Sequence, residues 1–333
     1  MVALPFRPSP VTILNHFRLL SAFYIQYNLC MGNTSLLAGV YAAVVTPLKP
    51  DLTPDLDGLT NLLQFLANRG CHGVLLMGTT GEGPSFSWEE RLLVYRTAAE
   101  IRQNISNFHL LAGTGTPSLE DTVFLTHSVF DLGYEGVVVL PPYYFKKVTN
   151  EGLFTWFSQV LDKAVPQDGS LLVYHIPPVS GVSFSLDLLA RLKDAYPVKF
   201  AGVKDSSSDP EWAQSMGARF GTELLLFNGN DRLFSLALQS GASGCITAMA
   251  NLLSPLHRYV WENFQNGISY EVTQDKLSAA REVLDRYPPF PPLIKMMLSR
   301  LHGFDLWKVK PPLSEFDPAQ VEIVLSEFFA ALE

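Results

Sequence analysis

The sequence contains only three cysteines, and their spacing fits no metal or disulfide motif. Cys30, Cys71 and Cys245 are far apart, odd in number and form no C-x-x-C pair, which supports neither a disulfide framework nor a thiolate zinc site. The seven histidines lack the H-x-x-x-H and H-E-x-x-H spacings that place two imidazoles on one helix face. We therefore expect a cytoplasmic protein that needs neither a metal nor a cofactor.

Positive charge and long apolar runs are also scarce. The 24 Lys and Arg residues face 32 Asp and Glu residues, for a net charge of −8, which is unsuited to gripping a phosphate backbone. No uninterrupted apolar run reaches the roughly 18 residues that a membrane helix needs. With 47% apolar and 17% charged residues, the composition is that of a globular chain. We expect neither nucleic acid nor a membrane as a partner.

The first 34 residues contain no acidic residue at all, but two arginines and three prolines, and they lack core periodicity. Basic, acid-poor leaders are typical of targeting segments. The alternative, which we favour, is an upstream-extended gene start with translation from Met31, where the composition changes. In either case we expect residues 1–34 to be an extension without fold, and the fold to begin near Ala38.

Beyond this extension, short apolar runs alternate with helical patterns such as the capping box of Ser87 and Glu90. The runs cover residues 39–45, 72–77, 109–113, 136–140, 171–174, 199–203, 223–227 and 243–247. Eight strands buried on both faces, each followed by a helix, predict an α/β fold, the (β/α)8 TIM barrel. An open doubly wound sheet would need a glycine fingerprint after its first strand, which is absent. We assign residues 35–254 to the barrel and 255–333 to a C-terminal helical appendage.

Barrel enzymes carry their reactive groups at the C-terminal ends of the strands, and Lys204 stands at such an end. The apolar residues 200–203 deliver it into the barrel mouth, where loss of water disfavours the ammonium form. A neutral amine adds to ketones and forms a Schiff base that acts as an electron sink. The competing interpretation is a surface lysine paired with Asp205.

Tyr174 precedes Lys204 by one strand-helix repeat, 204 − 174 = 30 residues, so both side chains project from adjacent strand ends. A phenol beside an imine-forming lysine can carry the protons that dehydration and C–C cleavage require. Alternatively, Tyr174 is a rim aromatic that packs on His175 or Pro177.

The turn Gly78–Gly83 lacks the G-K-[ST] ending of a P-loop and the spacing of a dinucleotide fingerprint. It offers two adjacent hydroxyls, Thr79 and Thr80, together with backbone N–H groups that suit a small carboxylate. A 2-oxo acid is the implied ligand.

Five motifs occur together in this chain: Gly-Thr-Thr-Gly-Glu at 78–82, Pro-Tyr-Tyr at 142–144, Tyr-His-Ile-Pro at 174–177, Gly-Val-Lys-Asp at 202–205 and Gly-Asn-Asp at 229–231. In order and spacing the chain resembles the dihydrodipicolinate synthase / N-acetylneuraminate lyase family from about Leu37 to the C-terminus. That family consists of class I, pyruvate-dependent aldolases on a (β/α)8 barrel with extra C-terminal helices, commonly assembled as a dimer of dimers. The resemblance implies a cofactor-free lyase that is a homo-oligomer.

By this resemblance, Lys204 is the Schiff-base lysine and Tyr174 the proton donor and acceptor. Thr79 would relay protons between Tyr174 and Tyr144, the latter reaching in from a neighbouring subunit, and Thr80 would hold the pyruvate carboxylate. The remaining residues expected to line the pocket are Gly81, Val179, Gly229, Asn230, Asp231 and Ile246.

One position departs from the lysine-biosynthesis synthases of this family. They carry an arginine two residues before the glycine of the strand 5 loop, whereas this chain has Val179, which offers a carboxylate no bidentate partner. We therefore expect cleavage or formation of the bond between pyruvate and an aldehyde, on a 2-keto-3-deoxy sugar acid or a sialic-acid-like substrate. The alternatives are 4-hydroxy-tetrahydrodipicolinate synthase, a keto-deoxy acid dehydratase, and a catalytically silent barrel that senses a 2-oxo acid.

Overall fold

The computed structural model describes residues 36–221 and 223–333, so the expectations for residues 1–34 lie outside the described part of the chain. Eight parallel strands close into a barrel in chain order, β1 to β8, with β8 pairing back onto β1. The strands are β1 (Gly39–Ala43), β2 (Gly73–Leu76), β3 (His109–Gly113), β4 (Gly136–Val139), β5 (Ser170–His175), β6 (Phe200–Asp205), β7 (Leu225–Asn228) and β8 (Gly244–Thr247). The TIM barrel expected from the sequence is confirmed.

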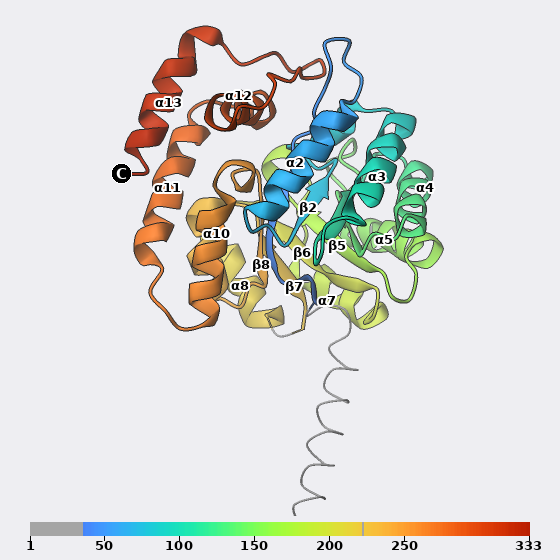
Figure 1. Ribbon diagram of the computed structural model, residues 1–333. Coiled ribbons are helices and arrows are strands. Elements are labelled where there is room, and N and C mark those ends of the chain that lie inside the picture. Colours follow the sequence, from blue (N-terminus) through green and yellow to red (C-terminus); the bar gives the residue numbers. More distant parts are fainter. Residues whose placement is uncertain (1–35, 222) are drawn as a thin grey trace, which may run out of the picture.

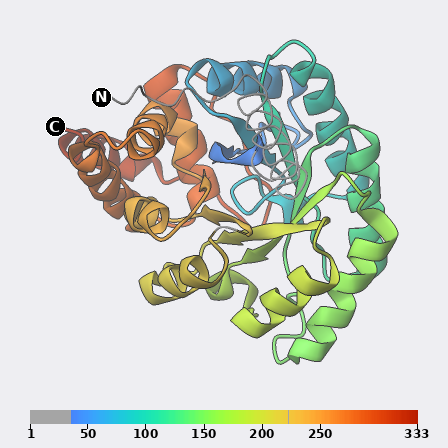
Figure 2. The same ribbon diagram turned by 90° about the horizontal axis from the view of Figure 1, so that it is seen from below.

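Helices surround this barrel, as Figures 1 and 2 show from the side and along the barrel. They are α2 (Leu56–Asn68), α3 (Trp88–Arg102), α4 (Leu119–Asp131), α5 (Asn150–Ala164), α7 (Leu186–Ala195), α8 (Pro210–Phe220), α9 (Phe234–Gln239) and α10 (Ala250–Gln265). The predicted capping box is present, because the Ser87 side chain accepts from the backbone of Glu90 while the Glu90 side chain accepts from that of Ser87. Reciprocal satisfaction of these groups sets the start of α3.

Two apolar cores lie on either side of the strands. A larger core packs the outer strand faces against the helices, and a smaller one fills the barrel interior with residues such as Tyr41, Leu111, Leu172 and Phe227. Because parallel strands are buried on both faces, the interior is packed. The middle of the barrel therefore has no room for a ligand.

The pairing of β5 with β6 shifts register between Leu171 and Leu172, so that β6 contributes one extra residue to the ladder. Ala201 packs in the barrel interior and Val203 in the outer core. The next residue, Lys204, consequently points inward, over an aromatic ring of the inner core. Strict alternation from Ala201 would have turned Lys204 outward, so this irregularity aims the side chain at the interior, as bulges beside active sites often do.

The C-terminal helices α11 (Glu271–Asp285), α12 (Phe290–His302) and α13 (Val321–Ala330) form a layer beside the barrel, coloured orange to red in Figure 1. The boundary expected after Ser254 falls inside α10, which packs against both β1 and the α11–α12 layer. None of the helices in the described part of the chain has both the length and the apolar composition to span a bilayer.

Candidate active site

Lys204 and Tyr174 meet inside the mouth of the barrel. Lys204 is 2% exposed and Tyr174 is 4% exposed, and they are register partners on β6 and β5. The Lys204 Nζ lies 4.0 Å from the centroid of the Tyr174 ring. The interpretations of Lys204 as a surface lysine and of Tyr174 as a rim aromatic do not fit this burial. An amine and a phenol are held side by side at the C-terminal end of the strands.

The Tyr174 hydroxyl is the centre of a hydrogen-bonded cluster. The Thr79 hydroxyl donates to the phenolic oxygen over 3.4 Å, and Ser206 and Lys204 form side-chain hydrogen bonds with it as well. Burial by itself raises the pKa of this phenol, but the charge of Lys204 and these hydrogen bonds outweigh it, so the net pKa of Tyr174 is lowered from its ordinary value. A phenol with a lowered pKa gives up and takes back a proton more readily.

Ser206 belongs to this cluster, although it was not among the residues expected at the site. It follows β6 immediately, so the rule that reactive groups stand just past the strand ends would have included it. A Cβ on Gly229 would collide with the Ser206 hydroxyl oxygen. Because residue 229 is a glycine, the Ser206 hydroxyl has room beside the loop that follows β7.

The loop between β2 and α3 brings Thr79 and Thr80 to the same mouth. Thr80 is buried, and the Gly81 carbonyl accepts from the Thr46 hydroxyl at 2.7 Å. Glu82 has a φ of 58°, in the left-handed region that a non-glycine residue rarely adopts. The loop is thus a tight, anchored turn.

Other residues expected at the site lie at its rim or wall. Ile246 is buried in the inner core, on β8. Val179 is 61% exposed in the short helix α6 (Pro177–Ser180) that follows β5. Tyr144 is 76% exposed, with its ring against Phe145. Within one chain, Tyr144 is therefore not part of the Tyr174 cluster.

Asp231 differs from its expected role. Its Oδ1 accepts from the Thr247 hydroxyl at 2.6 Å and from His257 Nε2 at 2.7 Å, while its Oδ2 accepts from Arg281 at 2.7 Å. These partners hold the β7 loop against α10 and α11, and they lower the pKa of the Asp231 carboxyl despite its burial. The Asp231 side chain is also completely buried, so this carboxylate serves the packing of the loop in the single chain. The neighbouring Asn230 donates its amide to Ser208 at 2.8 Å.

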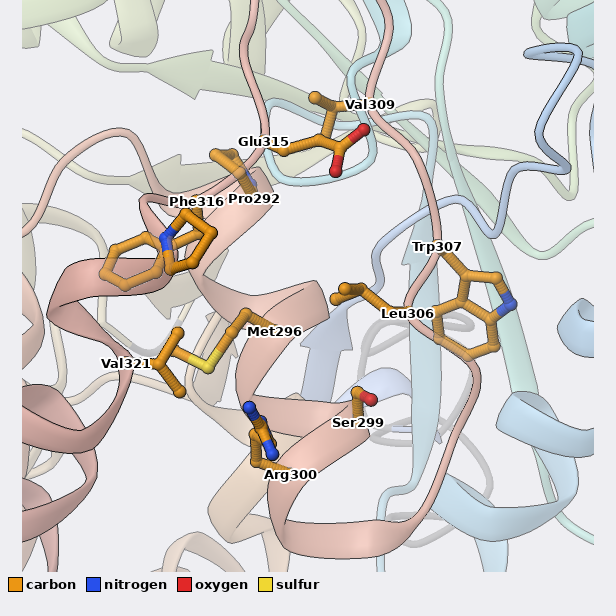
Figure 3. A pocket seen from close by; sticks show the side chains of 11 residues that line it. Pro292, Met296, Ser299, Arg300, Leu306, Trp307, Val309, Glu315, Phe316 and Val321 are labelled. Carbon is orange, nitrogen blue, oxygen red and sulfur yellow. The ribbon is translucent and has the colours of Figure 1, made fainter.

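Two other features of the described residues, 36–221 and 223–333, bear on ligands. No group of three or more His, Cys, Asp or Glu side chains among them is arranged to hold a metal ion. A pocket of about 410 Å³ lies between α12, α13 and the segment that joins them, lined by side chains such as Met296, Arg300, Leu306 and Phe316 (Figure 3). It contains none of the residues of the Tyr174 cluster.

The comparisons with known proteins agree with this barrel. Residues 36–324 match the model of the dihydrodipicolinate synthetase family. The chain belongs to this family. An uncharacterized DapA-like lyase of Chloroflexus aurantiacus is 37% identical, over 78% of this chain and 86% of the relative. A 4-hydroxy-tetrahydrodipicolinate synthase of Corynebacterium urealyticum is 30% identical, over 85% of this chain and 91% of the relative.

Solved structures show the same relationship. The dihydrodipicolinate synthase of Agrobacterium tumefaciens is 31% identical with a TM-score of 0.78, covering 89% of this chain and 99% of that one. YagE, a prophage protein of E. coli K12 solved with pyruvate, has a TM-score of 0.82 at 24% identity, over 89% and 99% of the two chains, which shows the shared fold. The family resemblance drawn from five motifs is confirmed, and the protein is a pyruvate-dependent lyase of the class I aldolase family.

Proposed function

We propose that this enzyme forms an imine between Lys204 and a 2-oxo acid. It would cleave or form the C–C bond between pyruvate and an aldehyde, on a 2-keto-3-deoxy sugar acid or a sialic-acid-like substrate. The contact of the Lys204 amine with the Tyr174 phenol supports the reaction. The apolar Val179 at the rim supports the substrate class.

Imine formation follows from the placement of the two side chains. The Lys204 nitrogen adds to the C2 carbonyl of the 2-oxo acid, and the resulting hydroxyl leaves as water once it has been protonated. Tyr174 supplies that proton, since its hydroxyl is beside the amine, and Thr79 and Ser206 hold it by hydrogen bonds. The products of this step are the protonated imine, one water molecule and the Tyr174 phenolate, which is the base that cleavage needs.

Cleavage uses the same phenol in the opposite direction. The C4 hydroxyl of the substrate loses its proton to the Tyr174 oxygen, the C3–C4 bond breaks, and its electron pair moves into the protonated imine to give an enamine. The aldehyde leaves, the enamine takes a proton at C3, and water releases pyruvate and the free Lys204. A lowered pKa of Tyr174 suits a group that must act as both base and acid near neutral pH.

We assign the carboxylate of the 2-oxo acid to the hydroxyl of Thr80 and the backbone of the turn around Gly81. Tyr144 would complete the proton relay from a second copy of the chain, because its side chain is 76% exposed on one protomer and stands outside the Tyr174 cluster. The proposed active unit is therefore at least a dimer, and we propose the dimer of dimers that the family commonly forms.

The substrate class depends on the rim. A second substrate with its own carboxylate favours a bidentate cation, and Val179 supplies none. The hydroxyl of Ser206 and the second N–H of the Asn230 amide, whose first N–H is assigned to Ser208, are the polar groups that we propose for the hydroxyls of a sugar acid. The second candidate is 4-hydroxy-tetrahydrodipicolinate synthase, which is favoured by the names of relatives that are 30% and 31% identical.

Borohydride trapping tests the reaction. The protein is incubated with pyruvate, reduced with borohydride and weighed by mass spectrometry; we expect one reduced pyruvate adduct per chain, on the peptide that carries Lys204. Lys204→Ala should gain no mass. An unmodified wild-type chain would refute the imine and favour a silent 2-oxo acid sensor.

A substrate panel tests the specificity. Aspartate semialdehyde with pyruvate is compared with keto-deoxy sugar acids, and the products are analysed for pyruvate and aldehyde. We expect turnover of a sugar acid with release of pyruvate. Turnover of aspartate semialdehyde alone would establish the synthase instead, and loss of water without pyruvate would establish a dehydratase.

A further inference from the structure

A buried ion pair lies behind the loop that carries Thr79. Lys295 Nζ donates to Glu82 Oε1 at 2.6 Å, and both side chains are within 1% of complete burial. The same nitrogen donates to the backbone carbonyl of Lys308 at 2.5 Å, and the backbone N–H of Lys310 donates to Glu82 Oε2 at 2.7 Å. Removing two charged groups from water costs free energy. The position of this ion pair behind the loop therefore needs an explanation.

The two partners of this ion pair are far apart in the sequence. Glu82 ends the Gly-Thr-Thr-Gly-Glu motif, whereas Lys295 lies 213 residues later on α12. The segment that follows α12, with Leu306 and Val309, runs back past that helix in Figure 3 and provides the remaining two hydrogen bonds. The α12 helix and the segment that follows it thus meet at one carboxylate of the loop that carries Thr79.

Glu82 is directly connected to Thr79. The Glu82 residue is in the left-handed conformation, and its backbone N–H donates to the Thr79 carbonyl at 3.1 Å, which closes the turn. The Thr79 hydroxyl then donates to Tyr174. Other anchors hold the carbonyls of Gly81 and Gly83, through Thr46 and Arg91. Glu82 closes the turn through its backbone N–H, and its carboxylate fixes the position of this residue.

We propose that Lys295 and Glu82 are positioning residues of the lyase, which fix the turn so that the Thr79 hydroxyl meets the Tyr174 oxygen. The C-terminal helices thereby set the proton relay without touching the substrate. This inference rests on the relay role proposed for Thr79, but not on the identity of the aldehyde. Small displacements of a positioned group are enough to slow a proton transfer.

The test measures deuterium exchange into the methyl group of pyruvate, which needs the imine and a proton transfer but no aldehyde. The variants are Lys295→Met, Thr79→Val and the two combined in the full-length chain. The matched control is Lys308→Met, which removes an ion pair with Glu315 on the same segment but keeps the backbone carbonyl that Lys295 uses.

We expect the exchange rate at saturating pyruvate to fall about tenfold in Lys295→Met and to stay within about twofold of wild type in Lys308→Met. If Lys295 acts through Thr79, the two losses will not add, and Lys295→Met will cost less than about twofold in the Thr79→Val background. Equal losses in both backgrounds would overturn the inference, because a general loss of structure slows both chains alike. A Thr79→Val chain that exchanges at the wild-type rate would instead refute the proposed relay.

A further double variant separates the stability of these proteins from their exchange rate. Lys295→Met with Glu82→Gln removes both charges, so no unpaired ion is buried and the melting temperature should recover toward wild type. We expect its exchange rate to stay at least about fivefold low, since the turn has lost its charged anchor. Recovery of the melting temperature and the rate together would show that the pair serves stability alone.

Discussion

Lys204 and Lys295 are both almost completely buried, yet their surroundings differ in kind. Lys295 meets a carboxylate and a carbonyl, whereas Lys204 lies over a phenol and has no carboxylate within ion-pair distance among residues 36–221 and 223–333. A carboxylate favours the charged form of a buried amine. Burial lowers the pKa of Lys295, and the adjacent Glu82 opposes that shift. Two equally buried lysines therefore differ in their partners, and the one without a counter-ion among the described residues is the one that we propose as the nucleophile.

The largest expected effect is that of Lys204→Met, which removes the proposed nucleophile. We expect turnover to fall by at least about 10³-fold. The free energy of unfolding should fall by no more than about 1.5 kcal/mol, because the hydrogen bond to Tyr174 is lost but no counter-ion is left unpaired. Steady-state kinetics and denaturant unfolding measure the two quantities. A loss as large as the one expected for Lys295→Met would show that Lys204 has a buried counter-ion after all.

Lys295→Met should reduce the stability of the fold far more than Lys204→Met does. Its removal leaves the Glu82 carboxylate buried with one backbone donor, and we expect the free energy of unfolding to fall by about 3 kcal/mol. Lys308→Met, whose ion pair is exposed, should change it by less than about 0.5 kcal/mol. Urea unfolding of both variants tests the difference, and equal losses would contradict it.

Substitution of Asp205 should have a smaller effect on stability than Lys295→Met. It tests whether Lys204 lacks a counter-ion, because Asp205 is its neighbour in the sequence. Burial raises the pKa of Asp205 from 3.8 to about 6, and the Ser207 backbone donates to it. A counter-ion of Lys204 would be expected to have a lowered pKa instead. Since the folded chain holds this proton more tightly than the unfolded chain, stability due to Asp205 falls as the pH rises from about 4 to about 6.

Asp205→Asn should therefore match wild type near pH 4 and exceed it by about 2 kcal/mol at pH 7. His175, whose pKa burial lowers to about 4, contributes the opposite slope to both proteins, so the difference between them isolates Asp205. Unfolding measured at several pH values provides the test. A destabilised Asn variant at pH 7 would mean that Asp205 is the counter-ion of Lys204 after all.

Much of the barrel could be predicted from local pattern. Each strand is a short apolar run that ends near the expected residue, and the cap at Ser87 is encoded within four residues. Lys204 and Tyr174 could be paired because one strand-helix repeat separates them. These features depend on neighbours in sequence or on the regular closure of the barrel, so periodicity and spacing are sufficient to place them.

The roles of single side chains at the rim could not be placed in the same way. Asp231 stands in a motif that suggests a substrate contact, but Thr247, His257 and Arg281 occupy its carboxylate. Ser206 follows β6 as a candidate should, yet its hydroxyl joins the site only because residue 229 lacks a Cβ. Such outcomes depend on which distant groups compete for one polar atom.

Hydrophobic period and turn chemistry were enough to specify the strands, the order in which they close, and the residue types offered at their ends, because each of these is written in neighbouring residues. The direction of those side chains and the groups they meet were settled only when the chain packed in three dimensions. The register shift that aims Lys204 inward and the contact of Glu82 with a lysine 213 residues away both arise from packing between strands and helices remote in the chain, which no local pattern contains.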